Sequence, residues 1–115
     1  MSSREIAVQG LTLQCTDGGT AQITTPPEQI KVNSKGVYCG PQVVSVTNAD
    51  NGSCHSASGT GTLNPTANCK GNSKAILRKN DQCTVTVNGT TSGGSPCSFS
   101  VTVTVLNAGS LAKCT

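Results

Sequence analysis

The sequence predicts a small all-β domain, a barrel, sandwich or wound β structure of short strands, with signs of a threefold internal repeat. β-branched residues alternate with polar ones along several short stretches, which is the pattern of half-buried strands. Turns rich in Gly and Asn separate these stretches, and none shows the apolar spacing and end caps of a helix. At 115 residues the chain has room for one domain, residues 1–115, and for no second core.

The expected strands follow one another along the whole chain. The clearest are residues 6–13, 42–47, 83–87 and 99–106, and weaker candidates are residues 22–24, 29–32 and 75–78. Turn residues lie between them, including Asn51-Gly52, Asn88-Gly89 and the run Gly59-Thr60-Gly61. We therefore expect residues 59–61 to form a turn.

A faint repeat overlies these strands. Three units, beginning at Val44, Val85 and Val103, each lead from a Val-x-Val strand through a Gly-Ser turn to a cysteine. Three similar units would give the fold pseudo-threefold symmetry. A chain this rich in Val, Thr, Gly and Ser also produces such patterns by chance, so both interpretations stay open.

Cross-links are expected because the core is thin. Tyr38 and Phe99 are the only aromatic residues, and aromatic rings contribute much of the burial in most cores. Seven cysteines can supply the missing stability as metal ligands, as disulfides, or as small buried thiols. We favour metal ligands, because the odd number cannot pair completely within the chain. The start also lacks the apolar segment of a signal peptide, so we expect synthesis in the reducing cytoplasm.

The composition argues against catalysis and against nucleic-acid binding. Eight basic and five acidic residues give a net charge of +3, without the basic stripe and stacking aromatics of a nucleic-acid binder. His55 is the only histidine, and its strand neighbour Cys54 would point to the opposite face. No phosphate-binding loop is present. We therefore expect no enzyme activity, no nucleic-acid partner and no small-molecule substrate.

One segment resembles a known family. Residues 73–83 are similar to the Gly-Lys-Pro-Ala-Ala-Arg-x-Gly-Asp segment of the PAAR spike-tip proteins: Lys74, Arg78 and Asp81 keep their places, while the proline and the glycine are replaced. Residues 10–18 resemble the opening of the cysteine-bearing PAAR-like branch. The resemblance implies a β cone on a trimeric β-helical spike of a contractile phage tail or related injection system, in contact with the target cell envelope. The protein would be made in the cytoplasm and then become part of a virion tail or spike.

The resemblance also implies a metal ion near the vertex of the cone, held in the family by histidines and a cysteine. With a single histidine here, cysteines would have to replace the others. The expected ligands of one structural ion, zinc in preference to iron, are Cys15, Cys54 or His55, Cys83 and Cys97. Cys83 is the firmest of these, because it follows the best-matching segment.

Two further expectations complete the hypothesis. The base that meets the spike should be apolar and lie near the strand ends around Val44, Val85 and Val103, whereas Cys114 should fray as a near-terminal residue. The alternative is a secreted or surface β-sandwich adhesin or pilus-like subunit, stapled by disulfides.

Overall fold

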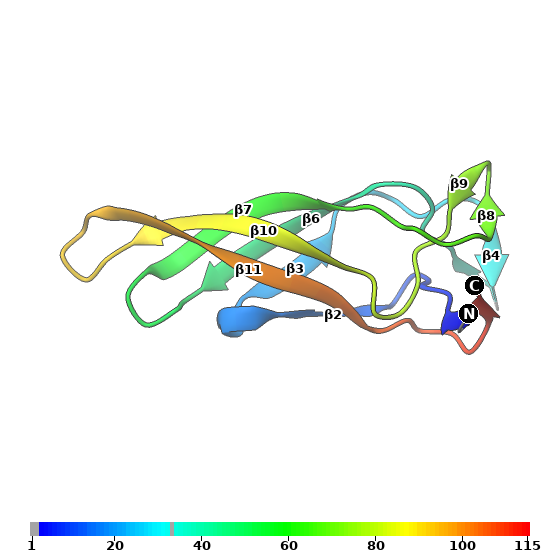
Figure 1. Cartoon of the computed structure of the whole chain (residues 1–115), viewed down its shortest axis with the longest axis horizontal. Coiled ribbons are helices and arrows are strands. Elements are labelled where there is room, and N and C mark those ends of the chain that lie inside the picture. Colours follow the sequence, from blue (N-terminus) through cyan, green and yellow to red (C-terminus); the bar gives the residue numbers. More distant parts are fainter. Residues whose placement is uncertain (1–2, 33) are drawn as a thin grey trace.

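The protein is a tapered, all-β body. The computed structural model describes residues 3–32 and 34–115 and measures 49 × 26 × 20 Å. Both chain ends lie at the wide end, and a single β-hairpin reaches the narrow end (Figure 1). The predicted all-β, cone-shaped fold class is confirmed. Among the described residues the only helical segment is a short turn at Thr16–Gly18, and no helix could span a membrane.

The body is a six-stranded antiparallel sheet that curls into a nearly closed barrel, with strand order β2-β11-β10-β7-β6-β3. Its two edge strands, β2 and β3, lie near each other without forming a ladder. The chain forms three consecutive strand–turn–strand units, called hairpin units, which lengthen along the chain: β2 (Thr12–Cys15) and β3 (Thr20–Ile23), β6 (Gln42–Ala49) and β7 (His55–Leu63), and β10 (Gln82–Thr90) and β11 (Pro96–Asn107). The strands of the second and third units pair with each other, whereas β2 pairs with β11 and β3 pairs with β6.

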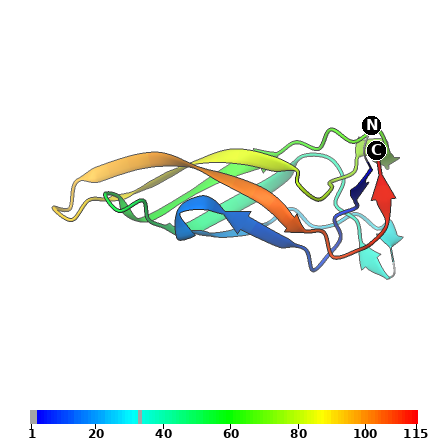
Figure 2. The same ribbon diagram turned by 60° about the horizontal axis from the view of Figure 1, so that its bottom comes forward.

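Three short antiparallel ladders form the corners of the wide end. Each joins the end of one hairpin unit to the start of the next: β4 (Lys31–Val32) with β5 (Lys35–Gly36), β8 (Lys70–Gly71) with β9 (Lys74–Ala75), and β12 (Lys113–Cys114) with β1 (Arg4–Glu5). A tight turn at Asn72-Ser73 closes the second corner, and residue 33 of the first corner lies outside the described residues. At the third corner the two chain ends meet (Figure 2).

A closed triangle of three segments crosses the wide end. These segments, residues 6–8, 37–39 and 76–78, are called the floor. The N–H of Ala7 donates to the Leu77 carbonyl at 2.8 Å, the N–H of Leu77 donates to the Tyr38 carbonyl at 2.9 Å, and the N–H of Tyr38 donates to the Ala7 carbonyl at 3.4 Å. Because each middle residue donates to one neighbour and accepts from the other, the wide end has pseudo-threefold symmetry.

The floor separates two apolar clusters. Ala7, Tyr38 and Leu77 belong to the main core, which fills the barrel with small aliphatic side chains, mostly valines of β6, β10 and β11. The flanking floor residues, among them Val8 and Val37, pack in a second, smaller cluster. Alternation along an extended segment explains this division, since neighbouring side chains point to opposite faces.

Three predicted elements are wrong in detail. The stretch 6–13 is not one strand, because the chain turns at Gly10, where φ is +94°, between the floor and β2. Asn88-Gly89 is not a turn but lies within β10. Residues 59–61 are likewise not a turn but lie within β7. A Cβ atom at Gly59 would overlap the carbonyl oxygen of Thr86, so glycine here allows β7 and β10 to approach closely.

The predicted repeat is wrong in its third member. Val44 and Val85 lie on the outgoing strands β6 and β10, but Val103 lies on β11, the return strand of the last hairpin. The true counterpart of β6 and β10 is β2. All three valines have an exposed fraction of 0%, so their own side chains form no part of the surface. The floor and the corner ladders cross the wide end, and an apolar base that meets a spike stays a prediction.

Candidate functional site at the two ends of the cone

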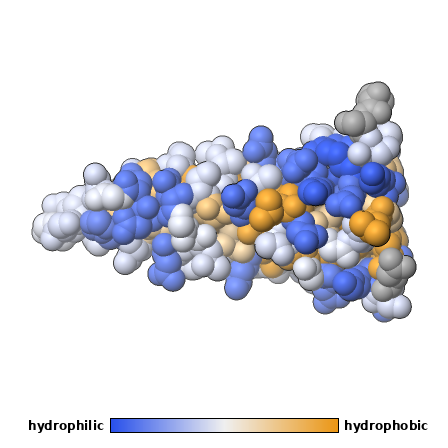
Figure 3. Space-filling model, turned by 90° about the horizontal axis from the view of Figure 1, so that it is seen from below, coloured by the Kyte–Doolittle hydropathy of each residue, from blue (hydrophilic) through white to orange (hydrophobic). Residues whose placement is uncertain are grey.

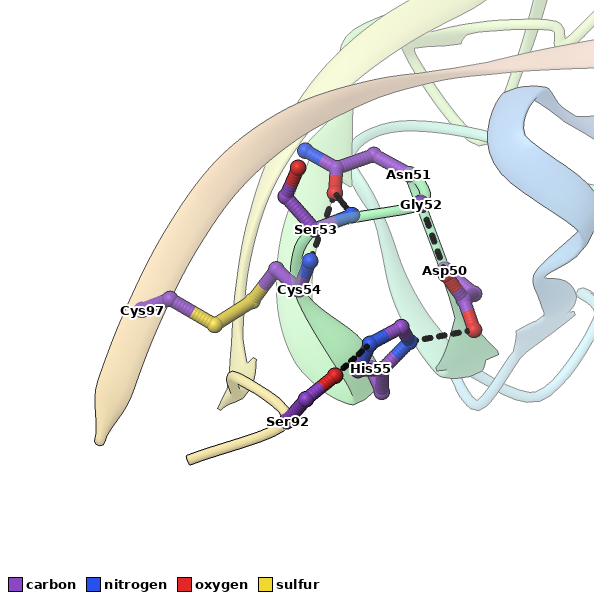
Figure 4. A network of polar contacts seen from close by, with 8 residues as sticks. All are labelled: Asp50, Asn51, Gly52, Ser53, Cys54, His55, Ser92 and Cys97. Carbon is purple, nitrogen blue, oxygen red and sulfur yellow. Dashed lines mark hydrogen bonds and ion pairs between the residues drawn. A yellow bond between two sulfur atoms is a disulfide. The ribbon is translucent and has the colours of Figure 1, made fainter. Parts of the chain in front are cut away.

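A disulfide ties two hairpins together near the narrow end. Cys54, which precedes β7, is bonded to Cys97 at the start of β11. The bond therefore joins the second hairpin to the third, which reaches furthest along the cone (Figure 4). A cross-link between neighbouring hairpins limits their separation where few apolar side chains hold them.

A polar network lies beside this disulfide. Nδ1 of His55 lies 2.8 Å from Oδ2 of Asp50, and its Nε2 lies 3.2 Å from Oγ of Ser92. Asp50 directly follows β6, the second hairpin's outgoing strand, and Ser92 belongs to the turn of the third hairpin (Figure 4). The hydrogen bond with His55, and secondarily that from the Gly52 N–H, holds the pKa of Asp50 below its usual range. His55 thus links the same two hairpins that the disulfide joins.

The order Asp50–His55–Ser92 is also that of an acyl-transfer triad. Catalysis would require oxyanion donors and a cleft that positions a substrate. Here the side chains of Asp50 and His55 have exposed fractions of 51% and 36%. Two surface hollows lie elsewhere, one at a corner of the wide end and one at the seam between β2 and β3. Because His55 contacts Asp50 of the second hairpin and Ser92 of the third, we interpret the network as a link between hairpins.

The structure divides the five predicted metal ligands into two groups. Cys15 and Cys83 lie on the two strands that flank β11, opposite the same β11 residue. Cys54, His55 and Cys97 lie toward the narrow end, separated from the first pair by roughly 20 Å of strand at about 3.4 Å per residue. The five residues therefore do not converge on one centre.

The bonding state of the cysteines also bears on a metal site. Cys54 and Cys97 share a disulfide, and only thiolates act as metal ligands. Within residues 3–32 and 34–115, no group of three or more His, Cys, Asp and Glu side chains could hold a metal ion. The residues as arranged do not fit a tetrahedral centre, and a structural zinc or iron ion stays a prediction for the reduced protein.

Three cysteines are free thiols: Cys15, Cys39 and Cys83. Burial raises the pKa of all three, and a neighbouring acidic group adds to the effect, Asp17 for Cys15 and Glu28 for Cys39. They therefore remain protonated at neutral pH, which makes them weak nucleophiles and weak ligands.

Cys114 is held in place and does not fray as predicted. It is bonded to Cys69, so the second disulfide fastens β12 to the segment before β8. The expected fraying is wrong because the sequence gives no sign of which segments meet at this corner.

The wide end carries almost all of the charge. All eight lysines and arginines lie on the floor, on the corner ladders or directly beside them, together with three of the five carboxylates. On the face seen in Figure 3, the wide end shows hydrophilic surface beside hydrophobic patches, and further hydrophilic surface lies along the narrow half. The described ion pairs are Arg4–Asp81 at 2.8 Å, Lys74–Glu28 at 3.7 Å and Lys79–Glu5 at 3.8 Å. More cations than carboxylates remain, so the wide end is strongly basic.

Two features of these ends were missed by the sequence reasoning. The contact between His55 and Ser92 depends on which hairpins are neighbours, and no local pattern in the sequence predicts it. The corners do have a recognisable sequence pattern, because the chain contains two similar segments, Lys31-Val-Asn-Ser-Lys35 and Lys70-Gly-Asn-Ser-Lys74. This duplicated turn marks the true repeat unit.

No protein-family model, curated protein or solved structure matches this chain. Its function has to be argued from its own residues.

Proposed function

We propose that the protein is a rigid tip that caps a trimeric β-helical spike of a contractile injection apparatus and helps to pierce the target cell envelope. The closed triangle of floor hydrogen bonds carries this proposal. A trimer ends in a threefold face, and a single chain can contact its three subunits equivalently only if its own face repeats three times. The floor and corner ladders provide such a face.

The shape and the cross-links support a mechanical role. The body tapers from the threefold wide end to one hairpin (Figure 2). The Cys54–Cys97 disulfide and the His55 contacts link the hairpins near that end. Such links resist separation of the strands under load. The zinc or iron ion implied by the resemblance is a separate proposal, restricted to protein in which Cys54 and Cys97 are reduced.

A second candidate is a secreted or surface adhesin or pilus-like subunit. Two disulfides favour it, because disulfides persist mainly in oxidising compartments. It does not explain the threefold wide end, and we therefore place it second.

Co-expression with candidate trimeric β-helical spike proteins tests the first proposal. We expect a stable complex of one tip with three spike chains, measured by native mass spectrometry and light scattering. A free monomer, or a complex with one tip for each spike chain, would refute the proposal. Binding to the surface of intact cells by the isolated monomer would support the adhesin instead.

A further inference from the structure

We infer that the wide end recognises an acidic end face of its trimeric partner, with one carboxylate from each partner chain meeting one of Lys31, Lys70 and Lys113. This inference rests on the proposed function and specifies the chemistry of the partner that the function requires.

The three lysines occupy equivalent positions. Each is the first residue of the strand that ends a hairpin unit, in β4, β8 and β12 respectively. Each also begins its corner ladder in the same register, opposite the second residue of the partner strand. The floor's pseudo-threefold symmetry therefore relates the three ammonium groups to one another, as it would relate three identical residues of a trimer.

These lysines are available for a partner. All three are exposed, and none makes an ion pair within the described part of the chain. The opposite ladder strands supply a second related set, Arg4, Lys35 and Lys74, of which Arg4 and Lys74 are already paired with Asp81 and Glu28. The described carboxylates of the protein thus leave Lys31, Lys70 and Lys113 without an ion pair.

Arg78 provides an independent observation. This floor residue has an exposed fraction of only 7%, and its buried Nε has no hydrogen-bond partner in the described structure. Its Nη2 reaches only Thr66 Oγ1, at 3.5 Å, and its guanidinium makes no ion pair with a described carboxylate. The equivalent floor positions are Val8 and Cys39, so the fold does not require a cation there. A buried guanidinium without a carboxylate is costly, and a partner carboxylate would relieve that cost.

Apolar side chains lie beside the free lysines. Leu111 has an exposed fraction of 84% and precedes β12, and Ile30, at 36%, directly precedes Lys31. An apolar contact surrounded by charged groups is the usual anatomy of a protein interface. Opposite charges around it fix the register and accelerate association.

The test compares two variants that lower the net charge equally. One carries Lys31→Gln, Lys70→Gln and Lys113→Gln. The other carries Thr84→Glu, Thr86→Glu and Ser98→Glu, at exposed positions on the body. Their affinity for the purified spike trimer is measured by calorimetry at low and high salt. We expect the lysine variant to bind about 10- to 100-fold more weakly at low salt and to lose most of its salt dependence, and the body variant to bind like the parent.

Two further arms separate the possible failures. A spike trimer whose end-face Asp and Glu residues are changed to amides should lose affinity for the parent but not for the lysine variant. Arg78→Met should raise the melting temperature of the free tip and weaken the complex. Parent affinity in the lysine variant would overturn the charge inference and leave the tip function intact, whereas no complex with the parent would overturn both. Binding of duplex DNA as tight as binding of the spike would overturn the choice of partner.

Discussion

Removal of the Cys54–Cys97 disulfide is expected to cost the protein a large part of its stability. The bond closes a loop with a sequence separation of 43 residues. The loop-entropy relation then gives about 4 kcal/mol of stabilisation at 25 °C. For a domain of this length, each kcal/mol corresponds to about 4 °C in melting temperature. Replacing both cysteines with alanine should therefore lower the melting temperature by roughly 15 °C.

Thermal unfolding followed by circular dichroism measures this effect, with and without a thiol reductant. The reductant should destabilise the parent more than the double variant, because the variant retains only Cys69–Cys114. Mass spectrometry after alkylation of the protein unfolded without reductant should find three free thiols. Equal melting temperatures of parent and double variant would refute the reasoning, as would a bound metal ion with all seven cysteines reduced.

Cys83→Ser is the matched single-cysteine control. A metal centre built on Cys83 predicts a large loss of stability, since loss of a metal site is among the most damaging changes. The structure shows a partly buried thiol with no covalent partner, so we expect a cost of only about 1 kcal/mol. A fall in melting temperature as large as that of the double variant would favour the metal centre.

Three other predictions address the body, the narrow end and the corners. Gly59→Ala should destabilise the protein by about 1–3 kcal/mol in urea titrations, because the new methyl group would collide with the Thr86 carbonyl; an unchanged midpoint would contradict the close approach of β7 and β10. Folding lowers the pKa of Asp50, so the contact of its ionised carboxylate stabilises the fold fully at pH values above the pKa of the unfolded state. This stabilisation is lost as the pH falls through the lowered pKa of the folded state. Asp50→Asn should therefore weaken the acid dependence of unfolding while His55 remains, and an identical pH profile would argue against the contact. A circular permutant that joins β12 to β1 by an Asn-Ser turn and opens the chain between residues 72 and 73 should keep the fold. The reason is that the three corner ladders have the same register; an unfolded permutant would contradict their equivalence.

The alternating strands were predictable because a period of two residues leaves a strong signal. The stretches 42–47, 83–87 and 99–106 all fall within β6, β10 and β11. β7 was not predicted because its glycines, Gly59 and Gly61, are typical of turns. Their role depends on the approach of another strand, which only the assembled barrel reveals.

The candidate site was less predictable, since it depends on which distant segments become neighbours. Cysteine spacing alone cannot say that Cys54 meets Cys97, because that requires the hairpin order of the barrel. Within residues 73–83, Asp81 has a local structural role. Asp81 accepts hydrogen bonds from the Arg78 N–H at 2.9 Å and from Arg4 Nη2 at 2.8 Å. It thereby fixes the chain where it leaves the floor for β10.

The combination of a regular base and an irregular body is the geometry that the proposed tip function would require. At the wide end, three equivalent segments repeat the same hydrogen bonds, and such equivalence would suit the three identical contacts of the proposed trimeric partner. Three identical hairpins would end in a blunt ring. The hairpins instead lengthen from the four-residue strands β2 and β3 to the twelve-residue β11, so one of them alone reaches the narrow end. A single chain can lose its symmetry along the axis in this way, whereas a homotrimer cannot, because its three chains have the same sequence.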